Sequence, residues 1–83
     1  MYEKMVFVTN TAGLLTRDSA AFSQTAGRYH SSIQVEYGDK IVNAKSMLGV
    51  LSLDIQRGTR VNLIAEGEDE EKAVEDLASI LTS

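Results

Sequence analysis

Residues 33–43 have the sequence IQVEYGDKIVN, and this stretch decides the fold. Its apolar residues alternate with Gln34 and Glu36, which is the period of a strand with one buried face. A two-residue turn signal follows at Gly38 and Asp39, and residues 40–43 return as a short second strand. The stretch therefore predicts an antiparallel hairpin near the middle of the chain.

Two further strands and three helices are expected around this hairpin. Residues 2–8 and 59–66 are rich in β-branched and other apolar residues and predict strands. Apolar residues at helical spacing predict helices over residues 16–28 and from about residue 69 onward, and Ser46 before the apolar run is a helix N-cap signal. The expected inward residues of these elements are Phe22, Ala26, Tyr29, Val61, Leu63, Ala65, Ala73, Val74, Leu77, Ile80 and Leu81.

The resulting order β-α-β-β-α-β-α predicts an α+β fold. Its 83 residues allow one domain, which we place over residues 1–83. Antiparallel strands with the helices on one face form a two-layer sandwich. Periodicity supports the elements but leaves the order of the strands in the sheet open.

Composition excludes several classes of protein. The chain has no cysteine, so disulfides and thiolate metal sites are ruled out. A net charge of −4 argues against nucleic-acid binding, which relies on basic patches. No apolar run approaches the roughly 20 residues that cross a bilayer, and the first residues lack a signal-peptide pattern. We therefore expect a cytoplasmic protein without a membrane segment.

Three segments resemble the HPr family, the phosphocarriers of the bacterial sugar phosphotransferase system. Residues 42–53, VNAKSMLGVLSL, resemble the family's regulatory-serine segment, and residues 63–70, LIAEGEDE, resemble its last strand and final helix start. Residues 13–17, GLLTR, lie where the family has its active-site loop. The similarity runs nearly end to end. It implies an open-faced sandwich of a four-stranded antiparallel sheet with three helices on one face.

The active-site loop departs from the family pattern at one decisive position. The resemblance aligns the family's phosphorylated histidine with Leu15, keeps Arg17, and aligns a family proline with Asp18. Leucine has no lone pair, so it cannot act as the nucleophile that carries a phosphoryl group. The catabolite-repression members of the family also lack that histidine, and residues 43–46 and 65–70 resemble them more closely than ordinary HPr.

Ser46 is the first candidate site. As an N-cap it would accept an amide of the first helical turn, and the resemblance adds phosphorylation as its function. A phosphate at this place would meet unpaired amides and a favourable helix dipole, with Lys45 and Arg17 nearby. Arg17 could hold a phosphate through its planar donor fork, or could be a solvated surface residue.

The apolar residues after Ser46 are the second candidate site. Met47, Leu48 and Leu51 could belong to the core or form a partner-docking patch, and Leu15 would enlarge that patch. An exposed apolar cluster rimmed by charge is typical of a partner site. The resemblance favours docking, because the outward residues of this helix contact partners in the family.

Other chemistry-bearing residues favour structural roles. His30 is the only histidine, does not align with the family's active one, and has no partner set for a metal. The acidic run over residues 66–71 matches no calcium loop and suits a solvated helix start. We expect no metal, no cofactor and no catalytic residue.

Three functions remain open. The first is a regulatory module, not an enzyme, that an HPr-type serine kinase/phosphorylase modifies at Ser46 and that docks on a transcription regulator of carbon catabolite control. The second is a phosphocarrier of the sugar uptake system, which requires another acceptor such as His30. The third is an unphosphorylated scaffold or homodimer, since edge strands invite pairing or swapping.

Overall fold

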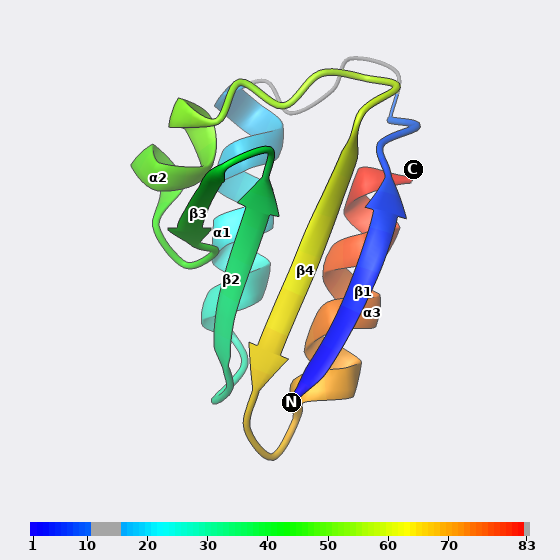
Figure 1. The fold of residues 1–83 in the computed structure, drawn as a ribbon. Helices are drawn as coiled ribbons and strands as arrows, with labels where there is room; N and C mark the ends of the chain where they lie inside the picture. The colour runs from blue at the N-terminus through cyan, green and yellow to red at the C-terminus, as the bar shows by residue number, and fades with distance from the viewer. Residues whose placement is uncertain (11–15, 83) are drawn as a thin grey trace.

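The computed structural model describes residues 1–10 and 16–82, without the side chains of Thr16 and Arg17. Within them the strands and helices follow the predicted order (Figure 1). The elements are β1 (Tyr2–Phe7), α1 (Thr16–Gly27), β2 (Ser32–Tyr37), β3 (Lys40–Asn43), α2 (Met47–Ser52), β4 (Arg60–Glu66) and α3 (Glu70–Leu81).

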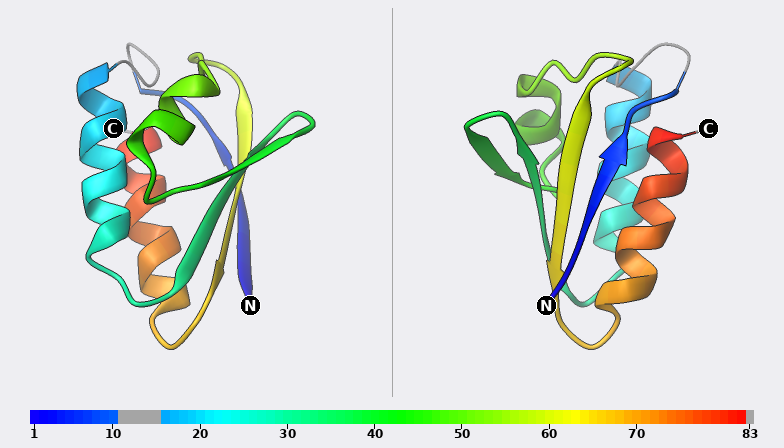
Figure 2. Two further views of the ribbon diagram at one scale, coloured as in Figure 1. Left: turned by 90° about the vertical axis from the view of Figure 1, so that its left-hand side faces the viewer. Right: turned by 45° about the vertical axis from the view of Figure 1, so that its right-hand side comes forward.

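The strands form one antiparallel sheet in the order β1-β4-β2-β3. The hairpin of β2 and β3 pairs Tyr37 with Lys40, so Gly38 lies in the turn, where its φ of 63° suits a residue without a side chain. β4 inserts between β2 and β1, which leaves β1 and β3 at the two edges. All three helices lie on one side of the sheet and the other side is uncovered (Figure 2). The predicted two-layer α+β sandwich is therefore confirmed.

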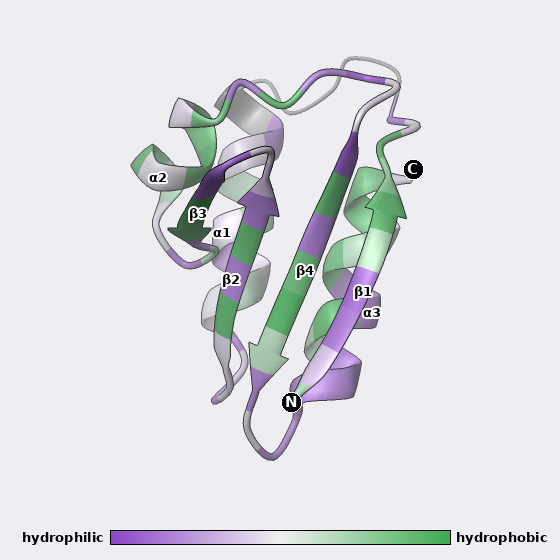
Figure 3. Ribbon diagram, in the orientation of Figure 1, coloured by the Kyte–Doolittle hydropathy of each residue, from purple (hydrophilic) through white to green (hydrophobic). Residues whose placement is uncertain are grey.

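The core lies between the sheet and the helices. Along β2 buried apolar residues alternate with polar ones, as the hydropathy colours show (Figure 3). In β4 the buried residues Val61, Leu63 and Ala65 alternate with less buried ones, of which Ile64 is apolar. The predicted inward residues of β4, α1 and α3 are buried, except that Tyr29 and Ile80 are half-buried. α1 ends at Gly27, one residue before the predicted end, so Tyr29 follows the helix. From there its hydroxyl donates a hydrogen bond of 2.5 Å to Asp76 on α3, which raises the pKa of Tyr29.

Candidate functional site

Ser46 caps the short helix α2, as the sequence predicts. Its backbone is extended, with φ −96° and ψ 110°, and its Oγ accepts a hydrogen bond of 3.1 Å from the amide of Gly49. Its carbonyl accepts the amide of Val50 at 3.0 Å. Ser46 is exposed, so its hydroxyl is accessible to solvent while it caps the helix.

The turn that leads into α2 fixes the position of Ser46. The side chain of Asn43 accepts the amide of Lys45 at 2.9 Å, and the carbonyl of Asn43 accepts the amide of Ser46 at 3.0 Å. Gly49 then packs closely against the cap. A Cβ at Gly49 would lie 3.2 Å from Ser46 Oγ and 3.4 Å from Val42 Cβ. A glycine therefore allows the helix to approach both its cap and β3.

Beside Ser46 the outer side of α2 is apolar. Leu48 is 77% exposed and Met47 is 36% exposed, whereas Leu51 is half-buried and Val50 is fully buried. We call Met47, Leu48 and Leu51 the α2 patch. The helix thus divides its apolar residues between the core and solvent, so the docking interpretation fits Leu48 and Met47 better than Leu51.

The remaining predicted site residues are only partly placed. Leu15 lies outside the described residues. Arg17 is the second residue of α1, and its side chain is likewise outside the description. The side chain of Lys45 binds the loop after α1, because its Nζ donates to the carbonyl of Tyr29 at 2.9 Å. Its charge therefore lies at the loop that follows α1, and the bond joins the turn before α2 to that loop.

The backbone of His30 takes part in a contact that the sequence did not predict. Asp69, the residue before α3, accepts the amides of His30 and Ser31 at 2.9 and 3.0 Å and the Ser31 hydroxyl at 2.5 Å. The Ser31 hydroxyl and these amides lower the pKa of Asp69 to about 2. Asp69 therefore joins two loops that lie 38 residues apart, and no local sequence signal indicates this contact.

Neither a metal centre nor a membrane span is found in the described part of the chain. No group of three or more His, Cys, Asp or Glu residues there could hold a metal ion. No helix there is long and apolar enough to cross a bilayer.

Comparison with known proteins assigns the family. The model of the "PTS HPr component phosphorylation site" matches residues 2–83. The HPr-like protein Crh of Bacillus subtilis (strain 168) is 46% identical over 79 residues, which cover 95% of this chain and 93% of Crh.

Solved structures agree with this assignment. The phosphocarrier protein HPr from Bacillus anthracis str. Ames superimposes with a TM-score of 0.93 at 41% identity, covering 96% of this chain and 95% of that one. Bacillus subtilis Crh, in a crystal structure described as a swapped, intertwined dimer, has a TM-score of 0.76 at 44% identity, with 98% and 93% covered. The sequence, the sheet order and the helical face agree with these relatives, and the chain belongs to the HPr family.

Proposed function

We propose that this chain is a regulatory module of carbon catabolite control that is switched by phosphorylation of Ser46 and has no catalysis of its own. One observation carries the proposal: Ser46 is exposed and borders the α2 patch in a chain 46% identical to Crh. In this proposal an HPr-type kinase in the cytoplasm modifies Ser46, and a transcription regulator reads the modified surface.

The local geometry around Ser46 is compatible with a phosphate. The hydroxyl oxygen accepts one hydrogen bond, from the amide of Gly49. Its own proton stays available for removal by the kinase when the oxygen is phosphorylated. A phosphoserine adds about −2 charge and three acceptor oxygens. One of these oxygens could keep the hydrogen bond to Gly49, so modification need not unfold α2.

A kinase reaction tests the first step. The protein is incubated with an HPr-type serine kinase and ATP, and its intact mass is measured. We expect a gain of one phosphoryl group in the wild type and in Ser52→Ala, and no gain in Ser46→Ala. Ser52 is the matched control because it is an exposed serine of the same helix, whose hydroxyl donates to the carbonyl of Gly49. Phosphate on Ser52, or on no residue, would remove the basis of the proposal.

The second step is docking through the α2 patch. Leu48 offers the most exposed apolar side chain of α2, and Met47 lies beside it. Burial of an apolar side chain of this size contributes about 1.5–3 kcal/mol, so Leu48 is the strongest candidate for a contact residue. In the proposal Leu15 and Arg17 extend the surface, the first by apolar contact and the second by pairing with the phosphate.

A phosphocarrier role is the second candidate, favoured by the likeness to the Bacillus anthracis phosphocarrier. The proposal takes Leu15 as the replacement of the family's phosphorylated histidine, so it predicts no transfer from phosphoenolpyruvate through the first enzyme of the system. Leu15→His should restore an acid-labile phosphoryl group, and Leu15→Gln should not. If the wild-type protein is labelled and the His30→Ala variant is not, the result would favour the carrier role instead.

A homodimer is a separate proposal, motivated by the swapped dimer described for Bacillus subtilis Crh. In this chain β1 is an edge strand. Light scattering over a range of protein concentrations tests it. A mass that stays at that of one chain would dismiss the dimer without affecting the proposal for Ser46.

A further inference from the structure

The outer edge of β1 has unpaired backbone groups. The amide of Val8 donates to the carbonyl of Thr59 at 2.8 Å, so Val8 faces β4. Backbone groups alternate in direction along an antiparallel strand. Those of Glu3, Met5 and Phe7 therefore point away from β4, and within the described part of the chain no strand pairs with that edge.

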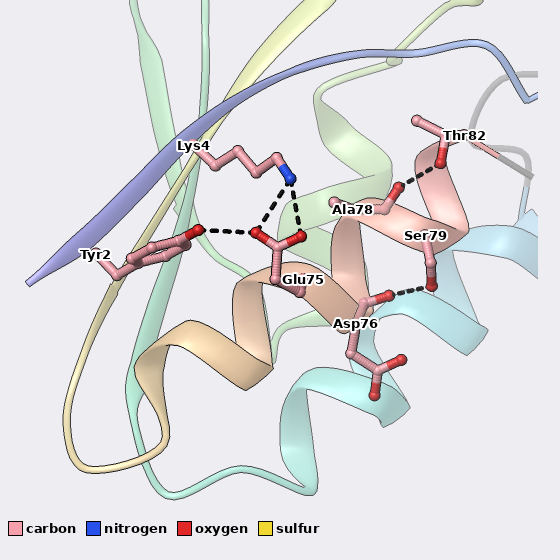
Figure 4. Close-up of polar contacts among 7 residues, drawn as sticks. All are labelled: Tyr2, Lys4, Glu75, Asp76, Ala78, Ser79 and Thr82. Carbon is pink, nitrogen blue, oxygen red and sulfur yellow. Dashed lines mark hydrogen bonds and ion pairs between the residues drawn. The ribbon is translucent and has the colours of Figure 1, made fainter.

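A groove of about 450 Å³ runs between this edge and α3. Its strand wall includes Lys4, Met5 and Phe7, and its helix wall includes Glu75, Ala78 and Ser79. The Ser79 hydroxyl bonds back to the carbonyl of Asp76 at 2.6 Å (Figure 4). The helix wall beyond Glu75 is thus made of short side chains, which leave room for the side chains of a second strand.

One end of the groove is held by charged contacts. Glu75 accepts the Tyr2 hydroxyl at 2.8 Å and Lys4 Nζ at 2.8 and 3.0 Å, as Figure 4 shows. Hydrogen bonding to Glu75 raises the pKa of Lys4, and Lys4 in turn lowers the pKa of Glu75. The charge of Lys4, which on an edge strand would discourage pairing, is therefore matched within the protein.

The solvent face of β1 changes from acidic to apolar along the strand. Glu3 is exposed and accepts the side-chain amide of Asn62 at 3.1 Å. Met5 is 61% exposed and Phe7 is 54% exposed, with the Arg60 guanidinium 5.9 Å from the Phe7 ring centroid. A strand paired with β1 would place its residues directly opposite these three side chains.

We propose that the β1 edge binds an extended peptide segment of a partner protein, which adds antiparallel to the sheet as a fifth strand. The peptide carries apolar residues opposite Phe7 and Met5 and a Lys or Arg opposite Glu3. Between them it carries small or β-branched residues that point into the groove above Ala78. Backbone hydrogen bonds supply affinity in this mode, and alternate side chains supply specificity.

A second copy of the chain fits this edge less well. In an antiparallel pair of two β1 strands centred on Met5 or on Lys4, Glu3 would face Phe7 or Met5 of the other copy. Glu3 would then have an apolar side chain opposite it, whereas a basic residue of a peptide would match its charge. Charge complementarity at Glu3 therefore selects a basic, apolar peptide as the occupant.

A peptide titration tests the proposal. ¹⁵N-labelled protein is titrated with acetyl-Val-Thr-Ile-Thr-Lys-amide, and amide shifts and hydrogen exchange are recorded by NMR. We expect shifts at Glu3, Met5 and Phe7. Their exchange should slow about tenfold at about 90% occupancy, because exchange then proceeds through the free fraction. The peptide acetyl-Val-Thr-Pro-Thr-Lys-amide, which lacks the central N–H, should produce neither effect.

Variants locate the binding at the edge. Met5→Pro removes an outward N–H and no internal hydrogen bond, so it should keep the fold and abolish binding, whereas Met5→Val should retain binding. Ser79→Arg, which fills the groove, should also abolish binding and covers the case in which the proline variant does not fold. Leu48→Ala should bind as the wild type does.

Three results would overturn the proposal. They are an absence of edge shifts with the probe peptide, undiminished binding to both Met5→Pro and Ser79→Arg, and edge shifts that follow protein concentration without peptide. The last result would assign the edge to a second copy of the chain.

Discussion

Asp69 shows how much one side chain contributes to the arrangement of the loops. It accepts hydrogen bonds from His30 and Ser31 and leaves α3 without a side-chain cap from its own N-cap residue. The nearby Glu70 fixes the turn before the helix, since its carboxylate accepts the amide of Gly67 at 3.1 Å. The sequence predicted an acidic helix start here, but it did not predict that Asp69 binds the loop after α1.

The lowered pKa of Asp69 makes stability depend on pH. Because its folded pKa of about 2 is below the usual 3.8, its contribution is present above pH 3.8 and is lost as the pH falls through about 2. We expect Asp69→Asn to be less stable than wild type at pH 7, with the difference shrinking toward pH 2. Urea unfolding at several pH values measures this, and an equal difference throughout would contradict the assignment.

Ser31→Ala tests the same contact from the other side. Loss of the hydroxyl, the largest cause of the lowered pKa, should raise the pKa of Asp69 toward 3.8. A carbon-detected NMR titration of the carboxyl group reports this directly. Ser32→Ala is the control, because Ser32 is the exposed neighbouring serine and should leave the titration unchanged. An unaltered pKa of Asp69 in Ser31→Ala would contradict this expectation and would show that the backbone amides alone lower the pKa.

At the scale of elements, helix α2 depends on its cap. It has six residues, too few to be stable alone. The hydrogen bond from the amide of Gly49 to Ser46 Oγ therefore contributes to the stability of the helix. We expect Ser46→Ala to destabilise the protein by about 1 kcal/mol and Ser46→Asp to keep most of that stability. Urea denaturation measures both variants. Unchanged stability in Ser46→Ala would mean that the cap contributes nothing measurable, and an equal loss in both variants would mean that a carboxylate cannot replace the hydroxyl as the cap.

The turn between β4 and α3 requires a glycine. Gly67 has φ 152°, and a Cβ there would lie 2.6 Å from Ser31 Oγ and 2.7 Å from its Cα. We expect Gly67→Ala to cost about 1–3 kcal/mol. Gly27→Ala is the matched control, since a Cβ at Gly27 meets nothing within 4 Å. Thermal unfolding distinguishes them, and equal midpoints would refute the close approach.

Local patterns predicted the elements well because each pattern reports one buried face. The hairpin was predicted from alternation and from Gly38, and the Ser46 cap from its place before an apolar run; the structure confirms both. Tyr29 was assigned to the apolar face of the helix over residues 16–28; it does pack against the core, but from the loop after α1, because the helix ends at Gly27. Contacts across the fold, such as Tyr29 with Asp76, have no local pattern.

At the scale of the whole molecule, the two candidate binding surfaces, the α2 patch and the β1 edge, lie at opposite sides. Strand order places β1 and β3 at the two edges, and α2 packs near β3 (Figure 1). The α2 patch and the β1 edge are therefore far apart, so each could contact a different partner. Sequence periodicity could not predict this separation, because the pairing of β4 with both β1 and β2 depends on contacts between distant segments.

The binding of a catabolite-control transcription regulator tests the central claim most directly. Isothermal titration calorimetry compares the unmodified protein, the protein phosphorylated at Ser46, and the phosphorylated Leu48→Ala variant. We predict that phosphorylation tightens binding by about tenfold or more, equivalent to about 1.4 kcal/mol, and that Leu48→Ala weakens it. Equal affinity of the modified and unmodified proteins would contradict a regulatory role for Ser46.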